Sequence, residues 1–322
     1  MKKYKPIIVV HGEPNSIFLE IFFKTIRRKF RSPLILIGSY KILKLQMKKL
    51  NCRKKINILE TKKLSSYKLN NNSINLINVN YNSAKAFDKI SSKSNSYIEN
   101  SFKIAFDILK SGFTDKFING PISKKNFLKK NHLGITEYIS EKFKIKNSAM
   151  LIYNKDLAVC PITTHLPLKY VSKNLNKKII KNKISLIIRF YKNYFKKNPR
   201  IAVLGLNPHC ESIDRFNEDE KVIKPTIKEL KNNFRYKISG PFSADTIFMK
   251  KNRVNFDVVI GMYHDQVLTP LKTLFEYNAI NITLGLPFIR ISPDHGPNEK
   301  MIGKNISNPL SLIKAVSFLE KN

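Results

Sequence analysis

Residues 257–266 read DVVIGMYHDQ, a short apolar run that is followed at once by a histidine and an aspartate. An apolar run of this length, bounded by turn signals, is typical of a buried strand. The same order occurs at two other places in the chain. The three runs with their histidines are 157–163 with His165, 201–206 with His209, and 257–262 with His264. We therefore predict three buried strands, each of which leads into a histidine-bearing loop.

Strand-like and helix-like patterns alternate along the rest of the chain. Further strands are predicted at residues 6–10, 34–37, 117–118 and 280–284, and helices at 17–30, 97–112, 177–196 and 309–319. Residues 51–93 are polar, and we expect them to hold one or two short strands and long loops. Alternation of this kind favours an α/β fold with mostly parallel sheets flanked by helices. A length of 322 residues is typical of two domains.

The three histidines are candidates for a shared metal site. The carboxyl ends of parallel strands meet at one edge of a sheet, where α/β proteins place their ligands. We therefore expect His165, His209 and His264 to converge there. Three neutral imidazoles suit a divalent transition metal and leave coordination positions open for a substrate. A single histidine at a strand end is more often a structural residue, so the repeated context carries this prediction.

Four further residues are candidates for the same site. Asp265, directly after His264, is expected to orient a ligand, to act as an acid or base, or to bind the metal, with a loop-capping role as the alternative. Lys272, Asn281 and Arg290 suit a substrate that carries carboxylate and phosphate groups. Arg290 is the most informative of these, because arginine is scarce in a chain so rich in lysine. A structural salt bridge is the alternative for Arg290.

Composition and missing motifs exclude several classes of protein. The 59 Lys and Arg residues against 23 Asp and Glu give a net charge of +36, but no aromatic-basic or zinc-finger pattern accompanies the scattered lysines. We therefore expect anionic metabolites as ligands and no nucleic-acid partner. No stretch approaches about 18 apolar residues, so we expect no membrane association and a cytoplasmic location. Residues 11–16 read HGEPNS where a standard Rossmann site would have GxGxxG.

Seven longer motifs occur in one order along the chain. They are residues 119–124 (NGPISK), 163–168 (TTHLPL), 206–209 (LNPH), 240–246 (GPFSADT), 262–266 (MYHDQ), 281–287 (NITLGLP) and 292–296 (SPDHG). Together they closely resemble the 4-hydroxythreonine-4-phosphate dehydrogenase family of vitamin B6 (pyridoxal phosphate) biosynthesis. The resemblance is strong over about residues 97–322 and weaker before them.

The resemblance implies a two-domain fold like that of isocitrate and isopropylmalate dehydrogenases. One domain is expected at residues 1–125, with about 300–322 returning to it, and the other at 126–299, with the active site in the cleft between them. The family pattern also implies a homodimer whose site is shared between subunits. It places a divalent metal (zinc, magnesium or cobalt) on His165, His209 and His264. The residues implied to contact the substrate are Thr136, Lys272, Asn281 and Arg290.

The implied reaction is a metal-dependent oxidation by NAD or NADP, with Asp265 and Lys272 as the catalytic residues. It converts 4-phosphohydroxy-L-threonine into 2-amino-3-oxo-4-(phosphooxy)butanoate, which loses carbon dioxide to give 3-amino-2-oxopropyl phosphate. The sequence assigns no residue to the nicotinamide cofactor.

One departure from the family pattern keeps an alternative open. Where the family has a His-Thr pair, this chain has Ile135-Thr136. The alternative is a sister dehydrogenase that acts on another phosphorylated hydroxy acid, such as threonate or erythronate 4-phosphate. A basic binding protein without enzymatic activity is a more distant alternative.

Overall fold

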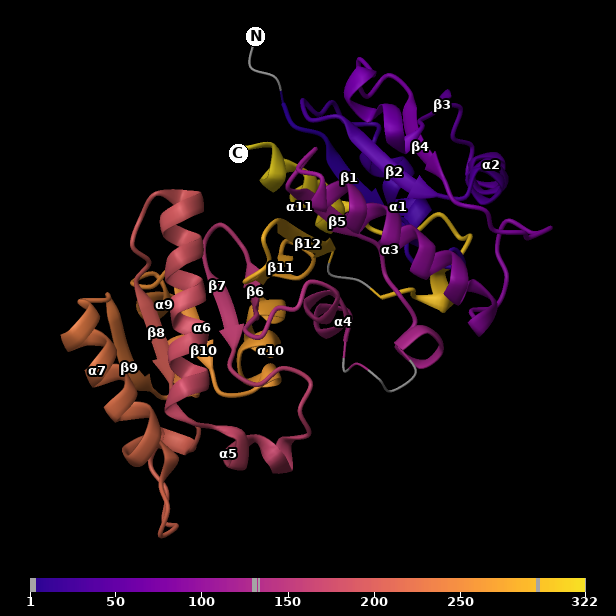
Figure 1. The fold of residues 1–322 in the computed structure, drawn as a ribbon. Helices are drawn as coiled ribbons and strands as arrows, with labels where there is room; N and C mark the ends of the chain where they lie inside the picture. The colour runs from indigo at the N-terminus through magenta and orange to yellow at the C-terminus, as the bar shows by residue number, and fades with distance from the viewer. Residues whose placement is uncertain (1–3, 129–131, 133, 294–295, 322) are drawn as a thin grey trace. The chain divides into compact units, whose positions relative to one another are not determined.

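The computed structural model describes residues 4–128, 132, 134–293 and 296–321 (Figure 1). It divides into two compact units, Met1–Tyr138 with Pro287–Asn322 and Ile139–Leu286. The chain therefore leaves the first unit once and returns to it after the second is complete. Among the described residues, no helix is long and apolar enough to cross a membrane.

The first unit is a parallel α/β layer structure. Its strands lie in the order β3-β4-β2-β1-β5-β12, and each of the pairings described is parallel. The strands are β1 (Ile7–Val10), β2 (Leu34–Gly38), β3 (Ile56–Ile58), β4 (Ile74–Asn78), β5 (Lys116–Asn119) and β12 (Ile289–Pro293). The helices are α1 (Phe18–Thr25), α2 (Tyr40–Lys49), α3 (Asn95–Lys110) and α11 (Leu310–Glu320). Helix α3 packs against β1 and β2, while α1 packs against α11.

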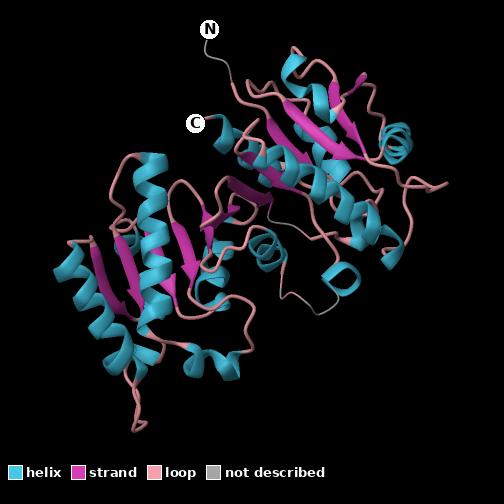
Figure 2. Ribbon diagram, viewed as in Figure 1, coloured by secondary structure: helices cyan, strands magenta, loops and turns pink. Residues whose placement is uncertain are grey.

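The second unit is a mixed sheet with helices around it (Figure 2). Its strands lie in the order β11-β6-β7-β10-β8-β9, antiparallel at β6 and parallel from β7 onward. The strands are β6 (Ala149–Tyr153), β7 (Ala158–Pro161), β8 (Ile201–Leu204), β9 (Ile238–Phe242), β10 (Val258–Gly261) and β11 (Ile280–Leu284). The helices are α5 (Val171–Asn174), α6 (Lys177–Phe190), α7 (Lys224–Phe234), α8 (Ala244–Ile247), α9 (Lys250–Arg253) and α10 (His264–Phe275). Helix α4 (Ile135–Lys142) begins in the first unit and ends in the second.

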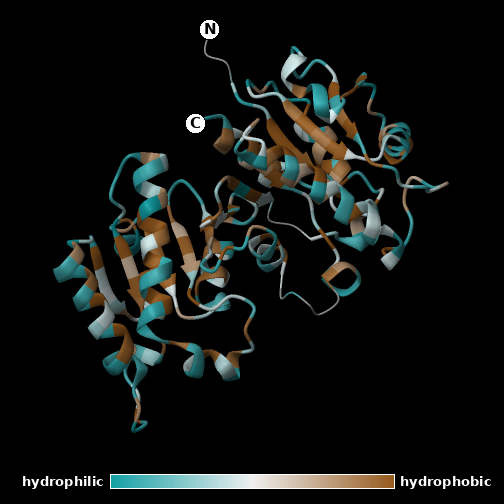
Figure 3. Ribbon diagram, viewed as in Figure 1, coloured by the Kyte–Doolittle hydropathy of each residue, from teal (hydrophilic) through white to brown (hydrophobic). Residues whose placement is uncertain are grey.

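The predicted α/β fold class is confirmed, and burial explains why the strands were recognisable. Every residue of β1, β2, β7, β8 and β10 is buried, as expected for strands that are covered on both faces. Figure 3 shows most strands in hydrophobic colours, whereas the helices alternate between hydrophilic and hydrophobic residues. A continuous apolar run therefore marks a strand in this protein, and a 3.6-residue period marks a helix.

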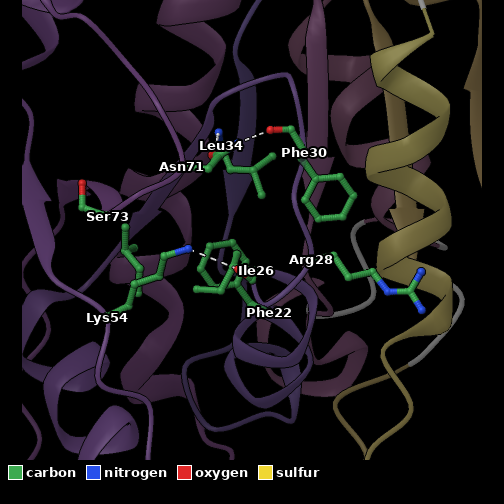
Figure 4. Close-up of a pocket in the computed structure, with 9 residues that line it drawn as sticks. Phe22, Ile26, Arg28, Phe30, Leu34, Lys54, Asn71 and Ser73 are labelled. Carbon is green, nitrogen blue, oxygen red and sulfur yellow. Dashed lines mark hydrogen bonds between the residues drawn. The ribbon is translucent and has the colours of Figure 1, made fainter.

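The helix predicted over residues 17–30 ends earlier than expected, at Thr25. Its last apolar positions, Ile26 and Phe30, instead line a small cleft that is drawn in Figure 4. The Nζ of Lys54 donates to the Ile26 carbonyl, and the Nδ2 of Asn71 donates to the Phe30 carbonyl. Side chains from other segments thus form hydrogen bonds with backbone carbonyls that lie beyond the end of the helix. No local pattern could reveal these contacts.

Candidate active site

The three strands that precede the histidines are neighbours in the second unit. Strand β10 pairs in parallel with β7 on one side and with β8 on the other. Gly261 lies opposite Pro161, so the chain leaves both strands at the same level and reaches His264 and His165 a few residues later. The two rings lie 5.8 Å apart between centroids and are tilted by 36°. Two imidazoles that bind one zinc ion through nitrogens at about 2.0–2.1 Å have centroids roughly 5–6 Å apart, so this pair fits a shared metal.

His209 follows the third strand, β8, but lies in a different kind of segment. It is exposed and sits in a one-turn 3₁₀ helix (Pro208–Cys210) with a positive φ of 54°. Over the described part of the chain, no group of three or more His, Cys, Asp or Glu side chains is close enough to hold a metal ion. The structure therefore brings His165 and His264 together, and a three-histidine metal site stays a prediction.

Asp265 is the hydrogen-bond partner of His264. Its Oδ1 lies 2.6 Å from Nδ1 of the imidazole, and its side chain is otherwise exposed in the first turn of α10. A neutral His264 that donates Nδ1–H to this carboxylate keeps the lone pair of Nε2 for a metal. Of the roles predicted for Asp265, the orientation of a ligand is the one that this hydrogen bond would serve, and it stays a prediction.

A pocket beside this pair contains a carboxylate that the sequence analysis did not single out. Asp245 in α8 lines it together with Tyr263 and Asp265, and the remaining wall comes mainly from α10. The signal was present in the sequence, because Asp245 belongs to the motif at residues 240–246, but nothing in its spacing linked it to the histidines. Gln266 lines the same pocket, and the sequence links it to the histidines only through the motif at residues 262–266.

Lys272 and Asn281 occupy partly buried positions in the second unit. Lys272 lies two turns beyond His264 in α10, and burial lowers the pKa of its ammonium group below the usual value. Asn281 lies in β11, and its Oδ1 is buried without a hydrogen-bond partner among the described residues. A buried acceptor of this kind is costly unless something donates to it, which supports a ligand-binding role for Asn281.

Arg290 is fully buried in β12 of the first unit. Its Nε donates to Oδ1 of Asn119 (2.8 Å), and its Nη1 donates to Oγ1 of Thr136 (3.1 Å). Burial lowers the pKa of Arg290 to about 10, and the charge of Glu137 opposes this shift, so the guanidinium stays protonated at neutral pH. Arg290 thus holds the end of β5 and the start of α4 in one place.

A pocket next to Arg290 is lined by the motif at residues 119–122, by Lys124 and Ile135, and by Ser292, Pro293 and Gly296. Gly120, one of the lining residues, cannot be replaced by a residue with a side chain, because a Cβ there would lie 2.1 Å from the carbonyl oxygen of His11. The Gly120 amide donates to the Val10 carbonyl, which fixes this close approach of the two chain segments. Asp294 and His295, from the motif at 292–296, lie outside the described residues.

The fold belongs to the α/β class that includes isocitrate dehydrogenase. The enzyme from Methylococcus capsulatus superposes with a TM-score of 0.52 at 8% identity, over 98% of this chain and 85% of that one. A family model described as "Pyridoxal phosphate biosynthetic protein PdxA" matches residues 29–319. The chain belongs to this family, as its motifs predicted.

Curated relatives and solved structures agree with this assignment. The 4-hydroxythreonine-4-phosphate dehydrogenase of Sulfurihydrogenibium sp. is 38% identical over 97% of this chain and 96% of its own length. The protein of the same name from Wigglesworthia glossinidia brevipalpis is 32% identical over 99% and 96%. A structure titled as a putative 4-hydroxythreonine-4-phosphate dehydrogenase from Salmonella typhimurium superposes with a TM-score of 0.86 at 26% identity, covering 98% of this chain and 99% of that one.

The buried guanidinium of Arg290 gives a testable prediction. Lysine carries the same charge but cannot donate to Asn119 and Thr136 in the same planar geometry. Arg290→Lys is therefore expected to lose at least one buried charged hydrogen bond and to lower the free energy of unfolding by about 1.5–3 kcal/mol in urea titrations. Arg200→Lys, at a half-exposed arginine, is the control and is expected to change it by less than about 0.5 kcal/mol. Equal unfolding midpoints for Arg290→Lys and the wild type would contradict the role of Arg290.

Proposed function

We propose that this chain is a 4-hydroxythreonine-4-phosphate dehydrogenase. Family membership supports the assignment, and the observation that carries it is the pairing of His165 and His264 at the carboxyl ends of adjacent parallel strands. A dehydrogenase of this family requires a nicotinamide cofactor, NAD or NADP, as hydride acceptor. The substrate is 4-phosphohydroxy-L-threonine, and the final product after loss of carbon dioxide is 3-amino-2-oxopropyl phosphate.

A divalent metal (zinc, magnesium or cobalt) is proposed to bind His165, His209 and His264. The distance between the His165 and His264 rings and the hydrogen bond from Nδ1–H of His264 to the Asp265 carboxylate support this ligand set. The position of His209 a few residues beyond β8, the strand that pairs with β10, supports it as the third ligand. When bound, the metal would supply Lewis-acid stabilisation of negative charge on the substrate oxygen.

The protein's own residues then bind the substrate and move a proton. Arg290, Thr136, Lys272 and Asn281 are proposed to bind its phosphate, carboxylate and other polar ends. Oxidation transfers a hydride from the hydroxyl-bearing carbon to the nicotinamide and releases the hydroxyl proton. Lys272 is proposed to accept this proton in its neutral amine form. Burial favours that form, because it lowers the pKa of the ammonium group below its usual value. The product is a β-keto acid, whose carbon–carbon bond to the carboxylate breaks to release carbon dioxide.

The functional unit is proposed to be a cytoplasmic homodimer with sites shared between subunits. Large apolar side chains exposed on the second unit support a covered surface there, among them Met249, Val254 and Tyr277.

The decisive test of the function is an assay of reduced-cofactor formation with a panel of phosphorylated hydroxy acids. We expect turnover with 4-phosphohydroxy-L-threonine and a fall of at least about 100-fold after chelation, because a Lewis acid contributes several kcal/mol to such a step. Restored activity after the addition of zinc, magnesium or cobalt would identify the metal. Full turnover in chelator would contradict the metal requirement.

Alanine variants test the ligand set. His165→Ala, His209→Ala and His264→Ala are each expected to lower turnover by at least about 100-fold and to bind less metal, while thermal unfolding stays close to that of the wild type. Lys169→Ala, an exposed position four residues after His165, is the control and should keep full activity. If one of these variants keeps normal activity and normal metal content, the histidine that it lacks is not a metal ligand.

Ile135 distinguishes this function from its alternative. Its side chain lines the pocket beside Arg290 and cannot donate a hydrogen bond, which favours the sister dehydrogenase for threonate or erythronate 4-phosphate as second candidate. If the substrate is 4-phosphohydroxy-L-threonine, Ile135→His should keep the order of substrate preference. The new imidazole can add at most one hydrogen bond to a charged group, which corresponds to a decrease in KM of about 10- to 150-fold. Negligible wild-type activity on 4-phosphohydroxy-L-threonine, with good activity on another acid of the panel, would establish the alternative.

A further inference from the structure

The buried side chain of Gln266 ties together the ends of strands β8 and β10, and the buried Asp219 holds the β8 end. The β8 end leads to His209, and the β10 end leads to His264. These strands are direct neighbours, but a sheet fixes only the backbone inside the ladder, and the residues beyond it need other contacts to hold their positions.

Gln266 links the two strand ends through the oxygen and the nitrogen of its side-chain amide. Its Oε1 accepts from the backbone N–H of Met262 (2.6 Å), at the start of the turn that carries His264. Its Nε2 donates to the carbonyl of Gly205 (2.7 Å), the residue that follows β8. The side chain is buried, so both bonds are protected from water.

Asp219 fixes the other side of the same junction. Its fully buried carboxylate accepts from the backbone N–H groups of Leu206 (2.9 Å) and Asn207 (3.1 Å), and also from the side-chain amide of Asn207 (3.0 Å). Gly205, which accepts the hydrogen bond from Gln266, also lies against Asp219. A Cβ at this position would lie 2.6 Å from the Asp219 carboxylate and 2.7 Å from Sγ of Cys210. The packing at this junction therefore leaves no room for a side chain at position 205.

We propose that Gln266 is a positioning residue, which sets the spacing of the His209 and His264 turns by bonding to Met262 and Gly205. This inference deepens the proposed function and rests on the metal site proposed there. Gln266 itself is not a metal ligand in this role; it acts through the backbone of the two turns. Residues of this type around metal sites typically change metal affinity by 10- to 100-fold when they are removed.

The test uses the metal-free full-length protein titrated with Co²⁺ alone, followed by visible absorption and by competition with a chelator. Gln266→Met has a similar size and removes both hydrogen bonds, and we expect it to bind Co²⁺ about 10- to 100-fold more weakly. Gln266→Glu is the second variant; it still accepts from Met262 but cannot donate to Gly205, and we expect weakened binding in the same direction. Turnover of Gln266→Met should rise towards the wild-type kcat at high Co²⁺, because the defect lies in metal binding.

Gln46 provides a matched control in the first unit. It is also fully buried, and its Nε2 also donates to backbone carbonyls, those of Pro14 (3.0 Å) and Ala86 (2.9 Å). Gln46→Met should lower stability to a similar extent but leave the affinity for Co²⁺ unchanged. Equal losses of Co²⁺ affinity in Gln266→Met and Gln46→Met would overturn the proposal, because the effect would then follow general destabilisation.

Hydrogen exchange separates this inference from the proposed function. In metal-free Gln266→Met, backbone amides in residues 205–210 and 261–264 should exchange faster than in the wild type, whereas Gln46→Met should leave them unchanged. Unchanged exchange in both segments overturns the positioning role even if the enzyme is active. Faster exchange, together with a wild type that does not bind Co²⁺ through its histidines, overturns the metal centre of the proposed function instead.

Discussion

The parallel pairing of β10 with β7 and β8 is the constraint on which the candidate metal site depends. Parallel strands in register end at the same level, so residues a few positions beyond Gly261 and Pro161 emerge side by side. A shift of one residue in the register would turn alternate side chains to the other face and separate the two imidazoles. Every residue of β7, β8 and β10 is buried. A shift in register would move these side chains away from the neighbours they pack against, so the register is strongly fixed. The chemistry at the sheet edge is thus set by apolar contacts inside the sheet.

The sequence predicted the elements whose pattern is local. Buried strands read as apolar runs, and helices such as α3 and α6 show clear amphipathic periods, so both were found near their true bounds. Helix α10 was missed as a whole, because a histidine directly after a strand reads as a loop, yet here it begins a helix. Strand β12 was missed for a related reason: Arg290 interrupts its short apolar run, and only the tertiary contacts with Asn119 and Thr136 make a buried arginine acceptable.

The candidate site was predictable to the extent that its residues stand in motifs. The proximity of His165 and His264 followed from the strand pattern together with the rule that parallel strands share an edge. The roles of Gln266 and Asp219 were not accessible in this way, because each depends on backbone groups of another segment, 61 residues away for Gln266 and Gly205 and 13 residues away for Asp219 and Leu206. Side chains that bond to backbone groups carry no signature of their partner, since any residue supplies the same N–H and C=O.

Arg290 and Lys272, the two cations proposed to bind the substrate, differ in their hydration from most of the other basic residues. In the described part of the chain most Lys and Arg side chains are exposed, where salt screens them over about 8–10 Å and their contribution to a bound ligand is small. Burial lowers the pKa of both Arg290 and Lys272, which means that their charged forms have lost part of their hydration. An anionic ligand restores favourable interactions to such groups, so its binding is strengthened where water has already been removed. The net charge of +36 therefore attracts anions to the whole molecule, whereas under the proposed function these two partly dehydrated cations would select the phosphorylated substrate.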